Sequence, residues 1–196
     1  MPPEYLDIVD EHSRVIGQEQ RRNVHQSGLW HRGVHVFLFT PARKLLVQQR
    51  SQAQDTFPGA LDCSVSEHLR VGESYRAGAA RGLREELGLK PPRLTRLLRL
   101  KMNYGPGDNM INELYQGLCP AGALAVDRRE ITRTAIYTLD ELEEMMAQGQ
   151  VPFAYWFRQL LLWYSGKPSA VQVLWEKPGF FKNQPGCPGK SGQWRT

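Results

Sequence analysis

One short stretch of the chain, residues 73–89, carries closely spaced acidic and basic side chains. Arg81 and Glu85 are four residues apart, so on a helix they share a face and can form an ion pair. Glu85 and Glu86 lie about 100° apart around a helix axis, and both carboxylates could therefore approach one cation. Oxygen ligands of this kind suit Mg²⁺ held together with a phosphorylated substrate. The stretch predicts such a site, and the alternative is a solvated helix face with weak ion pairs.

Other candidate donors lie outside this stretch. Glu113, in a predicted strand, is a candidate extra ligand or base. His68 borders the predicted site, and we assign it and Arg50 to substrate binding. His31 and His35 are interpreted as hydrogen-bonded core residues, because most histidines in a β-rich core have that role. Asp127 and Glu130 are interpreted as part of a solvated loop, although Glu130 precedes a predicted strand near the cleft.

The central helix that must position these residues is expected from Ser74 to Leu87. Ser74 is a suitable N-cap and Gly88 a suitable C-terminal stop. Gly78 and Gly82 lie in its middle, where each costs roughly 1 kcal/mol relative to alanine, so another segment is expected to approach the helix closely there. Strands are predicted for residues 6–9, 15–17, 34–40, 45–50, 61–65, 94–103, 110–118 and 135–138, and two later helices for residues starting at 140 and 152.

Length and composition predict one globular domain with an appendage. The chain has 196 residues, of which 41% are hydrophobic and 23% charged. Residues 1–168 are expected to form the domain, beginning with a β-hairpin. Residues 169–196 are rich in glycine and proline and are expected to form a mostly irregular tail, in which residues 171–175 could dock on the domain.

Charge and cysteine usage restrict the partners and the compartment. The net charge of +5 favours anionic ligands, but the basic residues form separate clusters without an aromatic-rich motif, which argues against a nucleic acid polymer. The three widely spaced cysteines include no CxxC pair and indicate a reducing compartment. No secretory signal is visible, and the longest apolar stretch is too short to span a bilayer. A cytoplasmic protein without a membrane partner is expected.

The pattern within residues 73–89 resembles the Nudix box, G-x5-E-x7-R-E-U-x-E-E-x-G-U, where U is aliphatic. Seven defining positions match, namely Glu73, Arg81, Leu83, Glu85, Glu86, Gly88 and Leu89. Outside the box, residues 6–11, 30–36 and 46–51 are similar to the subgroup of Nudix proteins that includes isopentenyl-diphosphate isomerases. The resemblance covers roughly residues 4–165.

The resemblance implies an α/β/α sandwich with a mixed β-sheet and a loop–helix–loop metal site. It also implies hydrolysis of a pyrophosphate linkage in a nucleoside-diphosphate-like or prenyl-diphosphate-like small molecule, with Mg²⁺ (or Mn²⁺) and an activated water. Carried over by position, Glu85 and Glu86 would be metal ligands. Arg81 would orient Glu85 and is also assigned to substrate binding, and Glu73 would brace the loop from behind. A homodimer is also implied, because dimers are common in the family.

Two positions depart from the Nudix box. Glu67 stands where the pattern opens with glycine, and Gly82 stands where it has a glutamate that usually binds metal. One hypothesis is that Glu67 supplies this carboxylate from the loop while Gly82 leaves space for it. Glu67 would then be a metal ligand and, with Glu86 and Glu113, a candidate catalytic carboxylate. The alternative is sequence drift in a weakly active protein that binds a phosphorylated ligand without efficient turnover.

Isomerase activity is less favoured by the residues at the corresponding positions. The isomerases need a cysteine just before a Gly/Ser-His-Pro segment, and Ser66 occupies that position here. Leu69 replaces the proline, whereas His68 and Glu113 do match. Cys63 lies three residues earlier and is expected to face elsewhere.

Overall fold

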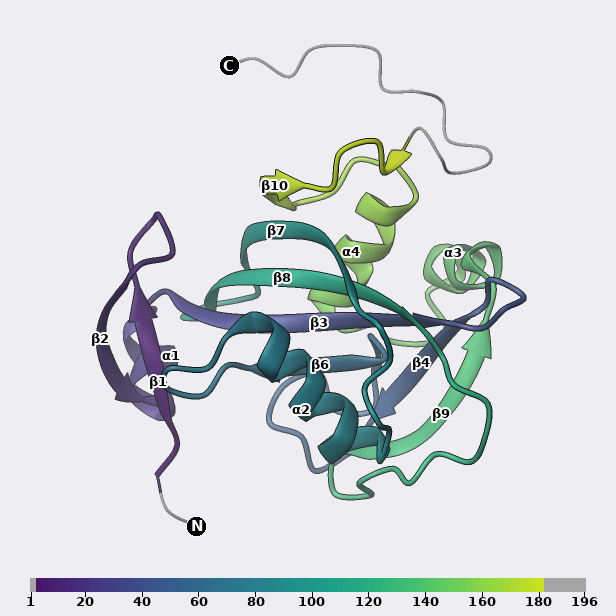
Figure 1. Ribbon diagram of the computed structural model, residues 1–196, viewed down its shortest axis with the longest axis horizontal. Coiled ribbons are helices and arrows are strands. Elements are labelled where there is room, and N and C mark those ends of the chain that lie inside the picture. Colours follow the sequence, from purple (N-terminus) through teal and green to yellow (C-terminus); the bar gives the residue numbers. More distant parts are fainter. Residues whose placement is uncertain (1–2, 182–196) are drawn as a thin grey trace.

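A curled, mixed β-sheet forms the centre of the computed structural model, which describes residues 3–181 (Figure 1). The strands are β1 (Tyr5–Val9), β2 (Val15–Gln20), β3 (His31–Phe39), β4 (Leu45–Arg50), β5 (Leu61–Asp62), β6 (Val65–His68), β7 (Thr95–Asn103), β8 (Asn109–Leu118), β9 (Ile131–Tyr137) and β10 (Gln172–Glu176). The helices are α1 (Arg21–Ser27), α2 (Tyr75–Leu87), α3 (Leu139–Gln148) and α4 (Tyr155–Tyr164).

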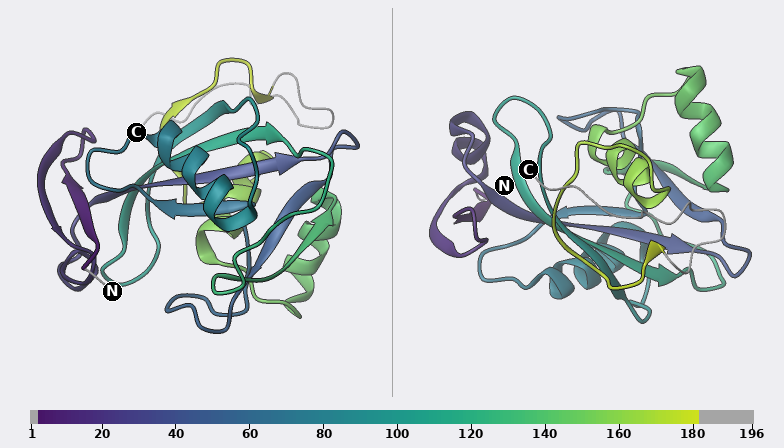
Figure 2. Two further views of the ribbon diagram at one scale, coloured as in Figure 1. Left: turned by 60° about the horizontal axis from the view of Figure 1, so that its bottom comes forward. Right: turned by 90° about the horizontal axis from the view of Figure 1, so that it is seen from above.

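Strand β3 organises the sheet. It pairs in parallel with β8 and antiparallel with β1, β4 and β6, and the main strand order is β10-β7-β8-β3-β1-β2. Strand β4 continues the sheet to β5 and β9. Helix α2 lies against one face, and α4 lies against the other (Figures 1 and 2). The predicted α/β/α sandwich with a mixed sheet is confirmed.

Alternating residues of β3 supply the two hydrophobic cores, because successive side chains in a strand point to opposite faces. Val34 and Val36 pack with the buried residues of α2. Phe37 and Phe39 pack with those of α4, including Phe157. This explains why the sequence of β3 is apolar on both faces.

Helix α2 begins and ends where its sequence predicts. The Ser74 hydroxyl accepts a hydrogen bond from the Ala77 amide at 3.3 Å, and Gly88 closes the helix with φ of 66°. The mid-helix glycines are explained by close packing on the sheet. A Cβ atom at Gly78 would collide with Leu69, and one at Gly82 would lie 2.5 Å from Val65 Cγ1. Only glycine lets the helix approach these side chains so closely.

The structure adds features that the sequence does not predict. Helix α1 was not expected, because its seven residues bury only Val24 and show no apolar period. The predicted strand over residues 61–65 is divided into β5 and β6 at Ser64. The Ser64 hydroxyl donates to Leu46 O and accepts from Leu38 N, as the chain changes partner from β4 to β3. Strand β10 pairs with β7, so the docking expected for residues 171–175 is seen. The predicted tail beyond residue 181 lies outside the described residues.

Within residues 3–181, no helix is long and apolar enough to cross a membrane.

Candidate functional site

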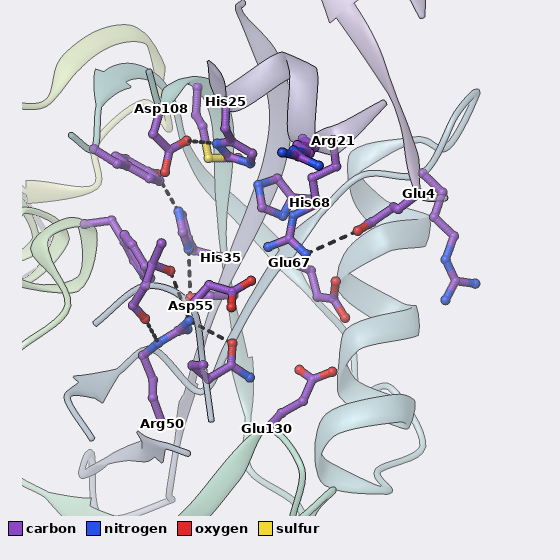
Figure 3. Close-up of a pocket in the computed structure, with 18 of the residues that line it drawn as sticks. Glu4, Arg21, His25, His35, Arg50, Asp55, Glu67, His68, Asp108 and Glu130 are labelled. Atoms are coloured by element: carbon purple, nitrogen blue, oxygen red, sulfur yellow. Dashed lines mark hydrogen bonds and ion pairs between the residues drawn. The ribbon is translucent and has the colours of Figure 1, made fainter. Parts of the chain in front are cut away.

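A cavity of about 900 Å³ lies around the short strand β6 (Figure 3). This strand pairs only with β3 among the described strands, so its other edge is free of sheet hydrogen bonds. Its side chains alternate between the two faces of the sheet. Glu67 is in register with Val34 and faces α2, whereas Ser66 is in register with His35 and faces the α4 side. The cavity is therefore lined by two different sets of residues.

On the α2 side, the buried carboxylate of Glu86 faces the partly buried carboxylate of Glu67. Glu86 is only 3% exposed, and its Oε2 accepts a hydrogen bond from Gln48 Nε2 at 3.0 Å. Its Oε1 has no hydrogen-bond partner among the described residues. Burial raises the pKa of Glu86 well above its usual range, and the nearby Glu67 raises it further. Burial also raises the pKa of Glu67 to about 7, although Arg81 acts in the opposite direction.

Gly82 provides the space in which these carboxylates meet. A Cβ atom at this position would lie 2.9 Å from Glu67 Cγ and 3.3 Å from Glu86 Oε1. A carboxylate oxygen without a partner, next to a second carboxylate, is costly unless a cation or a proton is present. The donor set on this side therefore fits a divalent cation that prefers oxygen ligands, such as Mg²⁺ or Mn²⁺.

Arg81 joins three carboxylates of this side. It forms ion pairs with Glu67 at 3.0 Å, Glu73 at 3.0 Å and Glu85 at 3.1 Å. It also donates to His68 O at 2.8 Å. The predicted Arg81–Glu85 pair is present, and Glu73 braces the loop by accepting from Arg81 and from the Arg70 amide. The guanidinium is thus committed to protein partners.

Glu85 lines the cavity but is held at its surface. Its carboxylate is 46% exposed and also pairs with Arg70 at 3.1 Å. Arg70 and Arg81 both donate to its oxygens, and its role as a metal ligand stays a prediction.

Glu113 is not brought to this cavity. Val34 is in register with both Glu67 and Glu113, so the three side chains share one sheet face. Helix α2 crosses between them, with Gly78 close above Val34. On the far side of the helix, the Glu113 carboxylate pairs with two arginines, Arg96 and Arg99, each at 2.8 Å. This placement gives no support to a role as ligand or base.

On the other side of β6, four residues from distant segments form a compact group. They are His25 from α1, His31 from β3, His68 from β6 and Asp108 from the loop before β8. One ligand atom from each lies within 4.8 Å of the others. Gly107 makes this approach possible, since a Cβ atom there would collide with the carbonyl of His25.

The group has the properties of a metal site. Within the described chain, His31 Nε2, His68 Nε2 and Asp108 Oδ1 are buried and have no hydrogen-bond partner. His31 Nδ1 lies 3.1 Å from Leu29 O and can donate to it, which leaves Nε2 free to bind a metal. Burial lowers the pKa of His31 to about 4, so the ring is neutral at pH 7. Imidazoles with one carboxylate suit Zn²⁺ or another transition metal.

His31 is buried and hydrogen-bonded to Leu29 O, as expected for a core residue, and its Nε2 also belongs to this group. His68 lines the cavity, and its role in substrate binding stays a prediction. No sequence motif links the four members of the group, because they lie on four segments that are far apart in the sequence. The adjacency of His68 to the Nudix-like stretch was the one available signal.

His35 does have the structural role expected for it. Its Nε2 lies 2.6 Å from Tyr104 Oη, and its Nδ1 lies 3.1 Å from Ser66 Oγ. Ser66 in turn donates to Asp62. Arg50, which we assigned to substrate, lines the cavity but pairs with Asp62 at 2.9 Å.

One cavity carboxylate was assigned to a solvated loop. Glu130 lines the cavity next to the α2 carboxylates. Its pKa is raised by partial burial and by the nearby Asp127. The sequence signal is its place just before Ile131, the residue at which β9 begins.

Comparisons with known proteins agree with this geometry. A family model described as the NUDIX domain matches residues 29–157. The chain is 32% identical, over 74% of its length and 75% of the relative's, to an uncharacterized Nudix hydrolase of Clostridium acetobutylicum. It is 35% identical to an isopentenyl-diphosphate Delta-isomerase of Streptomyces avermitilis, over 80% and 81% of the two chains.

Solved structures share the fold. The crystal structure of DR0079 from Deinococcus radiodurans superposes with a TM-score of 0.68 at 25% identity, over 81% of this chain and 97% of that one. The NUDIX domain of Shewanella oneidensis NrtR, solved with ADP ribose, gives a TM-score of 0.54 at 20% identity, over 66% and 82%.

Proposed function

The chain belongs to the NUDIX domain family, and on this basis we propose that it hydrolyses a pyrophosphate linkage in a nucleoside-diphosphate-like small molecule. The observation that carries the proposal is the unpartnered Oε1 of the buried Glu86, which faces Glu67 across the space left by Gly82. A divalent cation bound there would neutralise charge on the pyrophosphate oxygens. We place this site in a cytoplasmic enzyme, and the relevant cation is Mg²⁺ or Mn²⁺.

In this proposal each residue on the α2 side has one task. Glu86 and Glu67 hold the cation, and Glu67 replaces the carboxylate that residue 82 lacks. Arg81 fixes Glu67 by an ion pair of 3.0 Å and is a positioning residue. Gln48 holds Glu86 through Oε2, which leaves Oε1 as the oxygen available to the cation.

The charge of the cavity supports a metal-dependent reaction. Seven acidic residues line it but only five arginines, and four of those arginines already pair with carboxylates. A pyrophosphate would therefore meet a cavity in which the free charge is mainly negative. Binding of such a ligand needs added positive charge, and bound cations supply it.

The His25–His31–His68–Asp108 group is proposed to bind a second, transition metal. Three of its buried atoms have no hydrogen-bond partner among the described residues, and Asp108 Oδ1 lies 3.6 Å from His25 Nδ1 and 3.7 Å from His31 Nε2, which supports this assignment. Imidazole ligands distinguish it from the carboxylate side, so the two sites are expected to differ in metal preference.

The experiment is a turnover screen of the purified protein. Nucleoside diphosphate derivatives and isopentenyl diphosphate are incubated with Mg²⁺, with Mn²⁺ or with EDTA, and products are followed by ³¹P NMR. Metal-dependent cleavage supports the proposal. Ligand-stabilised melting without cleavage would instead identify a binding module, and formation of the double-bond isomer would identify an isomerase.

The role of Glu67 is tested by metal binding as well as by activity. Glu67→Gln should weaken Mn²⁺ binding at the carboxylate side at least about tenfold, measured by electron paramagnetic resonance. Gly82→Glu should also impair binding, because its side chain collides with Glu67. The triple variant Val65→Ala, Glu67→Gly and Gly82→Glu removes both contacts that a side chain at residue 82 would make, recreates the family pattern and should recover it. Unchanged binding in Glu67→Gln would remove Glu67 from the site.

A further inference from the structure

Glu130 is a cavity carboxylate that the proposed metal site does not use. It precedes β9, and its carboxylate makes no hydrogen bond or ion pair within residues 3–181. By contrast, Glu67 and Glu85 pair with Arg81, and Glu86 accepts from Gln48. An unpaired carboxylate at the rim of a cavity is available to bind and deprotonate a water molecule.

The backbone of Glu130 is fixed next to Glu86. The Glu130 amide donates to Asp127 O at 3.1 Å, and the Asp127 amide donates to Glu86 O at 2.9 Å. On the other side, the Ser51 amide donates to Glu130 O at 2.7 Å. One short turn therefore connects Glu130 to the last turn of α2, and the end of β4 holds it from the opposite direction.

The side chain of Glu130 points to the same space as the buried carboxylates. Glu67 and Glu130 extend from opposite sides of the pocket toward the gap beside α2 (Figure 3). Glu67, Glu86 and Glu130 all line this one cavity. Glu86 lines the same cavity, and its buried Oε1 has no hydrogen-bond partner among the described residues, which independently indicates that a ligand belongs beside it.

We propose that Glu130 is the general base of the hydrolysis, an inference that rests on the proposed function. Water attacks a phosphorus atom of the pyrophosphate, and the new P–O bond forms as the bridging P–O bond breaks. The bonding pair leaves with the bridging oxygen on the departing phosphate. The proton of the water passes to the Glu130 carboxylate and later to solvent, so that no other reactant is needed.

The test is the isosteric variant Glu130→Gln, with Glu144→Gln on the exposed face of α3 as the matched control. For the best substrate of the screen, Glu130→Gln should lower kcat about 100-fold or more, with KM within about threefold. Mn²⁺ affinity should stay within about threefold of the parent. The acidic limb of the kcat–pH profile should disappear, and Glu130→Asp should recover part of the rate. The control should behave like the parent.

Three other results would overturn either the assignment of Glu130 or the proposed function. A kcat within threefold of the parent, in an active parent, overturns the assignment of Glu130 and leaves the proposed function intact. A parallel tenfold loss of Mn²⁺ affinity overturns it too, by making Glu130 a metal ligand. A parent that hydrolyses no member of the screen overturns the proposed function itself, and with it the reaction in which Glu130 would act.

Discussion

The two faces of β6 carry chemically different halves of one cavity. On the α2 face the donors are carboxylates, and most belong to one contiguous helix and its flanking strand. On the α4 face they are three imidazoles and one carboxylate from four separate segments. Oxygen donors prefer Mg²⁺ or Mn²⁺, and imidazoles prefer transition metals such as Zn²⁺. A four-residue strand can thus divide a cavity into two sites with distinct ligand chemistry.

The largest expected effect comes from removing the carboxylate at the centre of the α2 face. Glu86→Gln should lower hydrolysis about 100-fold or more, since the charge stabilisation lost is several kcal/mol. Mn²⁺ binding on this face should weaken in parallel, whereas Co²⁺ binding to the histidine group should stay unchanged. Steady-state kinetics and metal titrations check this. Loss of both kinds of binding would show that the two faces form a single site.

The complementary change is made on the α4 face. His31→Gln removes one imidazole and should weaken Co²⁺ binding about 10- to 100-fold. The visible absorption of the bound ion measures this binding. Mn²⁺ binding at Glu86 should persist. His12→Gln, an exposed histidine of the β1–β2 turn, is the matched control. Retention of the full Co²⁺ signal in His31→Gln would contradict the assignment of this group.

The metal-free protein should show opposite pH dependence on the two faces. Folding lowers the pKa of His31 from 6.5 to about 4, so its contribution to stability is present above pH 6.5 and is lost as the pH falls toward 4. Folding raises the pKa of Glu67 from 4.5 to about 7, so its contribution is present below pH 4.5 and is lost as the pH rises toward 7. Each amounts to about 3 kcal/mol over its full range.

Urea unfolding in EDTA between pH 4.5 and 7 measures these slopes. Relative to the parent, Glu67→Gln should make the free energy of unfolding rise more steeply with pH, and His31→Gln should make it rise less steeply. Identical slopes in both variants and the parent would show that neither group changes its proton affinity on folding.

The smallest effect is expected at the outer edge of the carboxylate face. Arg70 is 61% exposed and Glu85 46% exposed, so their ion pair is screened by solvent. Arg70→Ala should change the free energy of unfolding by less than about 1 kcal/mol, with Mn²⁺ affinity within threefold. A tenfold change in affinity would instead place Glu85 among the metal ligands.

The sequence predicted those features of the fold and site that depend on residues close together in the chain. Helix α2, its cap residue Ser74 and the close packing at Gly78 and Gly82 all follow from local pattern, and the structure confirms them. The Arg81–Glu85 pair follows from helical spacing in the same way. These features depend on residues that are close in the chain, so sequence spacing is sufficient to find them.

The features that were missed depend on tertiary contacts. Asp108 meets His25 only because the loop at Gly107 packs on α1, a helix without an apolar period. Glu113 matched by position, yet α2 crosses the sheet between it and the cavity. Spacing gives the face of a strand on which a side chain lies, but the element that covers that face depends on the fold.

The alternation along β6 also restricts how this chain can vary. Because side chains in a strand repeat every two residues, inserting or deleting one residue before Val65 would exchange the two faces. Glu67 would then turn toward the histidine group, and His68 toward α2. Loops on either side can accept changes in length, but the stretch from Val65 to His68 cannot shift by one position without loss of both sites together. Grafting or shuffling of this segment should therefore preserve its length.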